Sequence, residues 1–272
     1  MQQDAWDVAR RAARDAGVEV RPLYELADTE AVNDVIRATW GERSTLPSEL
    51  LRAFQAGGDP PLGAVAEGRV VGFALGFLGP DAEGVHLHSH MLAVLPDVRR
   101  SGVGFALKLA QRAWALDAGI GVARWTFDPL QARNARFNLV KLGAVADRFH
   151  RHFYGDMGDE LNRGDRSDRM EARWDLDRDP GTTTYVADVP WPVVSREPAE
   201  PGSRPSTVRP PRGPVAVVEI PEDYPSMRER HPDLALEWRE AVADALEACM
   251  AAGMVATGFL PRCAYVFSTA SE

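Results

Sequence analysis

Three histidines at alternate positions lead into a glycine-containing loop in the stretch HLHSHMLAVLPDVRRSGVG, which begins at His86. Alternate residues of a strand point to one face, so the pattern predicts that His86, His88 and His90 share a face with Leu92 and Val94. A neutral imidazole titrates near about pH 6.5 and accepts a proton at physiological pH. His88 or His90 is therefore a candidate general base, with a satisfied structural histidine as the equal alternative.

The loop RRSGVG, Arg99 to Gly104, follows an expected strand and opens an expected helix. Backbone N–H groups at a helix N-terminus bind anions, and glycine lets the chain approach a phosphate closely. Two arginines beside the loop favour a pyrophosphate over a single carboxylate. A tight turn closing on a helix is the plainer alternative. The residues of this loop match neither the P-loop motif nor the glycine fingerprint of dinucleotide-binding folds.

The elements that must position these residues follow from hydrophobic periodicity and from glycine and proline punctuation. Strands are predicted at residues 18–26, 62–66, 70–79, 84–96, 121–129, 144–155 and 169–176, and helices at 3–16, 28–41, 46–58, 101–118 and 130–143. An antiparallel start joined to a βαβ crossover predicts an α/β fold with a mixed (α+β) sheet and helices on both of its faces.

Prolines cluster between residues 180 and 214, where they are expected to prevent both helix and ladder and to favour an extended tether. The predicted organisation is a first domain at 1–178, a linker at 179–213 and a small βαββ unit at 214–272. That unit is either a degenerate partial repeat of residues 86–128 or a subdomain that completes the sheet. Its size predicts packing on the first domain or on another protomer, as in a homodimer.

The formal net charge of −9 and the pI of about 5.3 argue against a nucleic-acid partner. The N-terminus carries frequent charges and does not resemble a signal peptide. The longest uncharged apolar stretch is too short to span a bilayer, so no membrane partner is expected. Two cysteines, Cys249 and Cys263, make no disulfide framework, and a cytoplasmic location is expected.

The stretch LAVLPDVRRSGVGFALKLAQRAW resembles motif A of the GNAT superfamily of acyl-CoA-dependent N-acyltransferases, Arg/Gln-x-x-Gly-x-Gly/Ala after the fourth strand. The order of elements from residue 18 to 176 is similar to that fold. The resemblance implies acetyl-CoA or another acyl-CoA, such as succinyl-CoA, as cofactor. It implies that the strand residues Leu92, Ala93 and Val94 bind the pantetheine arm and that the loop residues Arg99, Arg100, Ser101, Gly102, Val103 and Gly104 cradle the pyrophosphate.

A second stretch, WTFDPLQARNARFNLVKLGAV, resembles motif B of the same superfamily. Asn134 and Asn138 lie one helical turn apart and are predicted to face the cofactor arm, with capping or surface roles as the alternative. The sequence departs from the family pattern at Leu139, where a tyrosine often protonates the departing thiolate. Tyr154, at the end of the next strand, is the remaining candidate for the general acid.

The resemblance also bears on the histidines. Some arylalkylamine-acetylating members of the superfamily carry a His-x-His pair just before Leu-Ala-Val, and His88 and His90 match those positions. This implies a base that acts through water while strand amides polarise the thioester carbonyl. The predicted enzyme is an acyltransferase that acetylates or succinylates a small-molecule primary amine by direct attack.

Arginines and acids alternate in DELNRGDRSDRMEARWDL, before the last strand of this region. A solvated loop with ion pairs is the plainer interpretation. The functional alternative is a clamp in which Asp168 and Arg169 orient an amino-acid acceptor or the carboxylate of a succinyl group. The stretch is also similar to a GNAT branch in which N-succinylation of amino acids is suspected.

Two alternatives of other classes remain open. The first is a binding protein that senses acyl-CoA, in which Leu139 reflects lost catalysis. The second is a metal enzyme, because His150 and His152 repeat the alternating pattern and His-x-His pairs can ligate zinc or iron. No carboxylate ligand is evident near the first pair, and the predicted metal set is therefore none.

Overall fold

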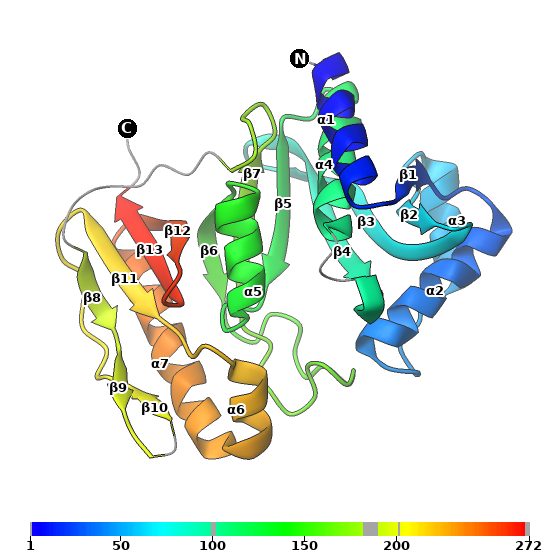
Figure 1. Ribbon diagram of the computed structural model, residues 1–272. Coiled ribbons are helices and arrows are strands. Elements are labelled where there is room, and N and C mark those ends of the chain that lie inside the picture. The colour runs from blue at the N-terminus through cyan, green and yellow to red at the C-terminus, as the bar shows by residue number, and fades with distance from the viewer. Residues whose placement is uncertain (1, 99–101, 182–189, 201, 270–272) are drawn as a thin grey trace. The chain divides into compact units, whose positions relative to one another are not determined.

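The computed structural model describes residues 2–98, 102–181, 190–200 and 202–269 (Figure 1). The chain forms two compact units, which are described separately. Unit 1 comprises Met1–Trp125, Gly158–Arg163 and Asp175–Asp177, and unit 2 comprises Thr126–Met157, Gly164–Trp174 and Arg178–Glu272. The first division falls inside one strand, between Trp125 and Thr126.

Unit 1 contains a mixed sheet, which confirms the predicted class. Its elements are α1 (Gln2–Asp15), β1 (Glu19–Pro22), α2 (Leu26–Trp40), α3 (Ser48–Gly57), β2 (Leu62–Ala66), β3 (Arg69–Asp81), β4 (Gly84–Val94), a 3-10 turn (Pro96–Val98), α4 (Val103–Asp117) and the first part of β5 (Val122–Phe127). Strands β1 to β4 pair antiparallel in chain order, and β5 pairs parallel to β4 after the α4 crossover.

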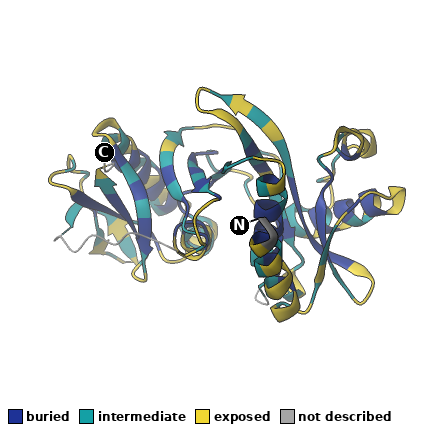
Figure 2. Ribbon diagram, turned by 90° about the horizontal axis from the view of Figure 1, so that it is seen from above, coloured by how far each residue is buried: buried dark blue, intermediate teal, exposed yellow. Residues whose placement is uncertain are grey.

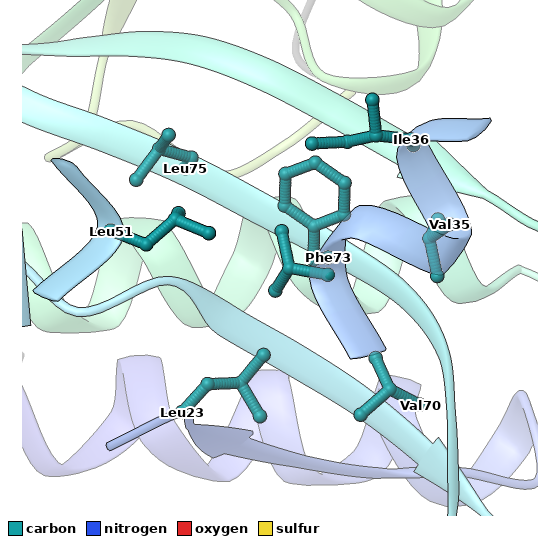
Figure 3. Close-up of a cluster of buried hydrophobic side chains, with 9 residues drawn as sticks. Leu23, Val35, Ile36, Leu51, Val70, Phe73 and Leu75 are labelled. Atoms are coloured by element: carbon teal, nitrogen blue, oxygen red, sulfur yellow. The ribbon is translucent and has the colours of Figure 1, made fainter. Parts of the chain in front are cut away.

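The core of unit 1 lies between the sheet and helices α2 and α3. Leu23, Val35, Ile36 and Leu51 pack there against side chains of β3 that include Phe73 (Figure 3). Helix α4 covers the other face, where glycines of β3 allow its close approach. A Cβ at Gly72 would lie 3.4 Å from Leu107, a residue of α4. The two faces of the sheet are thus both covered, as predicted.

A β-bulge interrupts β4 in the middle of the histidine stretch. Leu75 pairs with Met91 and Phe77 pairs with His88, so the single residue Gly76 faces two residues of β4. The extra residue reverses the side-chain alternation beyond it. Met91 and Ala93 consequently join the core under α2 and α3.

The predicted shared face of the histidines with Leu92 and Val94 is therefore wrong. A Cβ at Gly104 of α4 would lie 3.8 Å from both Leu92 and Val94, which places these two side chains on the α4 face. The histidine rings lie on the opposite face, beside Phe77. A one-residue shift of register moves every later side chain to the other side of a strand.

Unit 2 contains a second group of strands. Its elements are α5 (Ala132–Ala135), the π-helix η2 (Arg136–Lys141), β6 (Val145–His150), β7 (Arg169–Asp175), β8 (Trp191–Val194), β9 (Arg196–Pro198), β10 (Ser203–Pro205), β11 (Val215–Glu219), α6 (Tyr224–Arg230), α7 (Pro232–Ala251), β12 (Met254–Leu260) and β13 (Ala264–Thr269). The strand order is β7-β6-β12-β13-β11-β8. Because β12 pairs with β6 at Ala256 and Ala146, the C-terminal strands extend the sheet of β6 and β7.

The expectation that proline excludes a ladder from the linker is wrong for residues 191–194, and also for β9 and β10, which pair antiparallel. Strand β8 pairs parallel to β11, and its residues Val193 and Val194 are buried. Pro192 is tolerated because β8 is the edge of the sheet, where one side of the strand needs no partner for a backbone N–H. Figure 2 shows buried residues concentrated in the strands and on the helix faces that cover them.

Candidate active site

The three histidines of β4 form a row of neighbouring rings. The ring centroids of His86 and His88 are 6.3 Å apart, and those of His88 and His90 are 5.9 Å apart. Phe77 of β3 stacks on His88 at 4.9 Å. The structure therefore brings together the imidazoles that the sequence pattern predicted to be neighbours, although the bulge lies between the last two.

The three imidazoles differ in their surroundings. His86 Nδ1 lies 3.3 Å from the carboxylate of Asp81, which agrees with a structural role. His88 is half-buried, whereas His90 is exposed. Surrounding protein atoms nevertheless desolvate the His90 ring and lower its pKa below the ordinary value. A lowered pKa keeps the imidazole neutral, and hence able to accept a proton, at neutral pH.

A buried polar group lies behind the bulge, on the α4 face of β4. Lys108 Nζ donates to Ser89 Oγ at 2.8 Å, and Ser89 Oγ donates to Gln111 Oε1 at 2.7 Å. The Lys108 amine also lies 3.7 Å from the centroid of the Trp125 ring. This group was not predicted from the sequence. Its signal is that Lys108 and Gln111 occupy positions of the 103–117 helix that are otherwise apolar.

The glycine loop begins helix α4 as predicted. Gly102 has a φ of 95°, in the left-handed region, and its carbonyl accepts from the N–H groups of Phe105 and Ala106. The first-turn amides of a helix, here those of Val103 and Gly104, have no acceptor within the helix and carry the positive end of its dipole. The predicted pyrophosphate residues Arg99, Arg100 and Ser101 lie outside the described residues.

The strand residues predicted to hold the pantetheine arm lie beyond the bulge. Strand β4 pairs with β5 at Leu87 and His88, before the bulge. Ala93 is buried in the core, while Leu92 and Val94 are half-buried. The buried side chain of Ala93 is therefore not accessible at the surface of the strand.

The motif B helix lies in unit 2 and changes its form along its length. Asn134 is exposed on α5, whereas Asn138 is buried in the π-helix η2. A π-turn is wider than an α-turn, so residues four apart no longer stack on one face. The two amides thus have different environments. Leu139 is fully buried, so the family's frequent tyrosine position is part of the core here.

Tyr154 lies just after β6, in an aromatic cluster of unit 2. Its hydroxyl is 2.9 Å from Thr126 Oγ1, at the end of β5. The Phe153 ring meets the Tyr154 ring edge-on at 4.7 Å, and the Arg169 guanidinium lies 5.3 Å from the Tyr154 centroid. Both aromatic side chains remain exposed, which leaves the phenol accessible.

Asp168 and Arg169 are both buried. The Asp168 carboxylate accepts from the Arg166 guanidinium at 2.7 and 2.8 Å and from the His152 backbone N–H at 3.0 Å. Arg169 donates to the Asp168 carbonyl at 2.8 Å. These bonds favour a structural role for Asp168; the ion pair agrees with the plainer sequence interpretation, but the burial of both residues differs from the solvated loop that it expected.

The candidate residues therefore fall into two sets, one in each unit. Unit 1 holds the histidines, the bulge and the start of α4, and unit 2 holds the motif B asparagines, Tyr154, Asp168 and Arg169. Among the residues that the structure describes, no group of three His, Cys, Asp or Glu side chains is arranged to hold a metal ion. Within the same ranges, no helix is both long and apolar enough to cross a bilayer.

Residues 22–143 match the acetyltransferase (GNAT) family. The match runs from the end of β1 through the histidine row and the glycine loop to the end of the motif B helix. This segment, which holds the histidine row and the glycine loop, is therefore similar to acetyltransferases of the GNAT family. No curated protein matches the chain.

Several solved structures are similar to the chain. The ribosomal-protein-S18-alanine N-acetyltransferase from Escherichia coli is 15% identical, with 62% of this chain and 99% of that chain covered and a TM-score of 0.48. Naa20 from Chaetomium thermophilum, in complex with a bisubstrate analogue, is 21% identical, with 60% and 88% covered and a TM-score of 0.48. The putative acetyltransferase yncA from Salmonella typhimurium, with its cofactor acetyl-CoA, is 18% identical, with 63% and 99% covered and a TM-score of 0.44.

Proposed function

We propose that the protein transfers an acetyl or succinyl group from its coenzyme A thioester to the primary amine of a small molecule, such as an amino acid. The observation that carries the proposal is the histidine row on β4, which spans the bulge and precedes the glycine loop. The two free cysteines, Cys249 and Cys263, are in keeping with a cytoplasmic location. The proposed acyl transfer proceeds by direct attack, without an acyl-enzyme.

An amine attacks a thioester only in its neutral form, so the reaction needs a base. His90 is the favoured candidate because the residue is exposed to solvent while surrounding protein atoms lower the pKa of its imidazole. His88 is the second candidate, and the ring of Phe77 orients it. The amine proton passes to the imidazole through water, and the nitrogen forms a bond to the carbonyl carbon.

Breaking the carbon–sulfur bond releases a thiolate, which must be protonated. The buried Leu139 supplies no proton, and the exposed phenol of Tyr154 is the proposed donor. Its hydrogen bond with Thr126 fixes the position of the hydroxyl. Backbone amides of β4 around Leu92 and Val94 would hold the pantetheine arm and polarise the thioester carbonyl.

For the cofactor, we propose that the amides at the start of α4 bind the pyrophosphate together with Arg99, Arg100 and Ser101. The left-handed Gly102 supports this proposal because it turns the chain into the helix without a side chain. Arg169, beneath the Tyr154 ring, is the proposed contact for a carboxylate on the acceptor or on a succinyl group.

Product mass spectrometry with acetyl-CoA and succinyl-CoA, each mixed with a panel of amino acids and other primary amines, tests this function. Mass detection identifies the acylated amine directly. An acylated amine, lost in the His90→Gln variant, is the expected result. Tight binding of acyl-CoA without turnover across the panel would instead support the sensor alternative.

A further inference from the structure

The chain between β6 and β7 contains two segments that belong to unit 2, residues 151–157 and 164–168. These segments are the two arms of the connection. The arms are bonded to each other. The Tyr154 N–H donates to Ser167 Oγ at 3.1 Å, and Ser167 Oγ donates to the Gly155 carbonyl at 2.7 Å. The Phe153 N–H donates to the Ser167 carbonyl at 2.9 Å. The backbone position of Tyr154 thus depends on where the second arm lies.

Helix α7 holds the second arm and the end of β5 with one side chain. Arg239, which is 1% exposed, donates to the Asp128 carboxylate at 2.8 and 3.2 Å and to Asp165 at 3.1 Å, with a further bond to the other Asp165 oxygen. Tyr224 of α6 also donates to Asp165, at 3.2 Å. A planar guanidinium can bridge two carboxylates in this way, whereas an ammonium cannot do so with the same geometry.

The bridge keeps the Asp128 carboxylate ionised although it is buried. Burial alone would raise the pKa of Asp128, but the charge of Arg239 and its hydrogen bonds hold the pKa below its ordinary value. A second hydrogen bond holds the chain next to Asp128, because the Tyr265 hydroxyl donates to the Pro129 carbonyl at 2.7 Å. The end of β5 is therefore a rigid point of attachment.

The outer face of α7 ties both arms at their bases. Arg151 donates to Glu247 at 2.6 Å and to Glu240 at 3.0 Å, and it also reaches Asp244. Arg166 donates to the other oxygen of Glu240. Glu240 thus accepts from one arginine of each arm, and α7 holds the two arms together.

Arg239 lies at the meeting point of these contacts. Asp128 is two residues beyond Thr126, and Asp165 is two residues before Ser167, the residue that binds the Tyr154 backbone. The hydrogen bond between Tyr154 and Thr126 therefore joins two segments, and Arg239 holds each of them through a carboxylate. We propose that Arg239, supported by Glu240, is a positioning residue that holds Tyr154 in place for its role toward the acceptor and the thiolate. Helix α7, which carries both residues, is therefore required for acyl transfer. This inference rests on the proposed function.

Matched variants of the full chain test the proposal. Glu240→Gln removes a charge that serves both arms, whereas Glu237→Gln removes an equally exposed charge of α7 that pairs with Arg204 instead; their side chains are 47% and 48% exposed. Arg239→Lys and Arg239→Met compare retained with lost charge at the bridge. The readouts are hydrogen exchange of residues 151–157 and 164–168, kcat and KM for the amine, and the Kd for acetyl-CoA.

We expect Glu240→Gln to speed exchange in the arms and to lower kcat/KM for the amine about fivefold, with the Kd for acetyl-CoA unchanged. Arg239→Lys should retain part of the activity that Arg239→Met loses. Exchange and amine kinetics of Glu240→Gln and Arg239→Lys equal to those of Glu237→Gln would overturn the proposal. If the wild type turned over no amine, the proposed function would fail, and the exchange data alone would decide whether α7 holds the arms.

Discussion

The amine of Lys108 lies 2.8 Å from the hydroxyl of Ser89, the residue at which β4 bulges opposite Gly76. Lys108 is 3% exposed, and burial lowers its pKa to about 7. The amine can therefore be neutral near physiological pH, and it is held between a hydroxyl and the face of Trp125. A titratable group thus lies directly behind the strand on which the candidate base is placed.

Replacing this lysine should make the protein more stable in acid. The Lys108 pKa is lowered from 10.5 unfolded to about 7 folded, so the unfolded chain holds the extra proton between these values. Wild-type stability from this group should rise as pH increases from about 7 to about 10.5. Lys108→Met should gain on the order of 3 kcal/mol at pH 6 and less at pH 9 in urea unfolding. A gain that is the same at both pH values would contradict this account.

The bulge should not tolerate a side chain at Gly76. A Cβ there would lie 2.9 Å from the His88 carbonyl oxygen and 2.9 Å from Leu87 Cδ1. Gly76→Ala should lower the free energy of unfolding by about 1–3 kcal/mol, because backbone must move. Gly57→Ala, in α3 with open space around it, is the control and should stabilise by up to about 1 kcal/mol. Equal effects of the two substitutions would rule out this packing argument.

The two glycines of the loop should differ in what they tolerate. Gly102 has a φ of 95°, so Gly102→Ala should cost about 1 kcal/mol or more and weaken acetyl-CoA binding. A Cβ at Gly104 would lie 3.8 Å from Leu92 and Val94, an ordinary contact, so Gly104→Ala should keep both stability and binding. Chemical unfolding and titration calorimetry measure the two effects, and a reversed order of sensitivity would contradict the assigned geometry.

The pH profile should identify the base. Because the His90 pKa is lowered, kcat/KM for the amine should fall only as pH drops below the ordinary histidine value. His90→Gln should reduce kcat/KM on the order of 100-fold and remove this acid limb. His152→Gln, at an exposed site in unit 2, is the control. Retention of the acid limb in His90→Gln would assign it to another group, with His88 the next to test.

Local sequence patterns predicted most of the helices and strands of unit 1. Helical periodicity, caps and glycine stops predicted α1 to α4, and the order of strands around α4 predicted the parallel pair of β4 and β5. The predicted side-chain face of Leu92 and Val94 was wrong because the β-bulge in β4 arises from its pairing with β3. Gly76, sixteen residues or more before the misassigned Leu92 and Val94, has to lie opposite Ser89 and His90 for the alternation to reverse.

Unit 2 was less accessible to sequence reasoning. The proline density around Pro192 suggested a tether, but an edge strand needs backbone hydrogen bonds on one side only. The pairing of Asn134 with Asn138 assumed an α-helical turn, which the π-helix η2 does not provide. The bridge of Arg239 to Asp128 and Asp165 joins residues far apart in the chain, and no local pattern indicates such a partner.

Calorimetric titration of the full chain with acetyl-CoA, alongside acetylated pantetheine that lacks the pyrophosphate, tests the central claim most directly. If the amides at the start of α4 bind the pyrophosphate, acetyl-CoA should bind at least about tenfold more tightly than the truncated thioester, because charge-assisted hydrogen bonds to phosphate oxygens are strong. Equal affinity for the two, or binding of neither, would contradict the assignment of this loop as the acyl-CoA site.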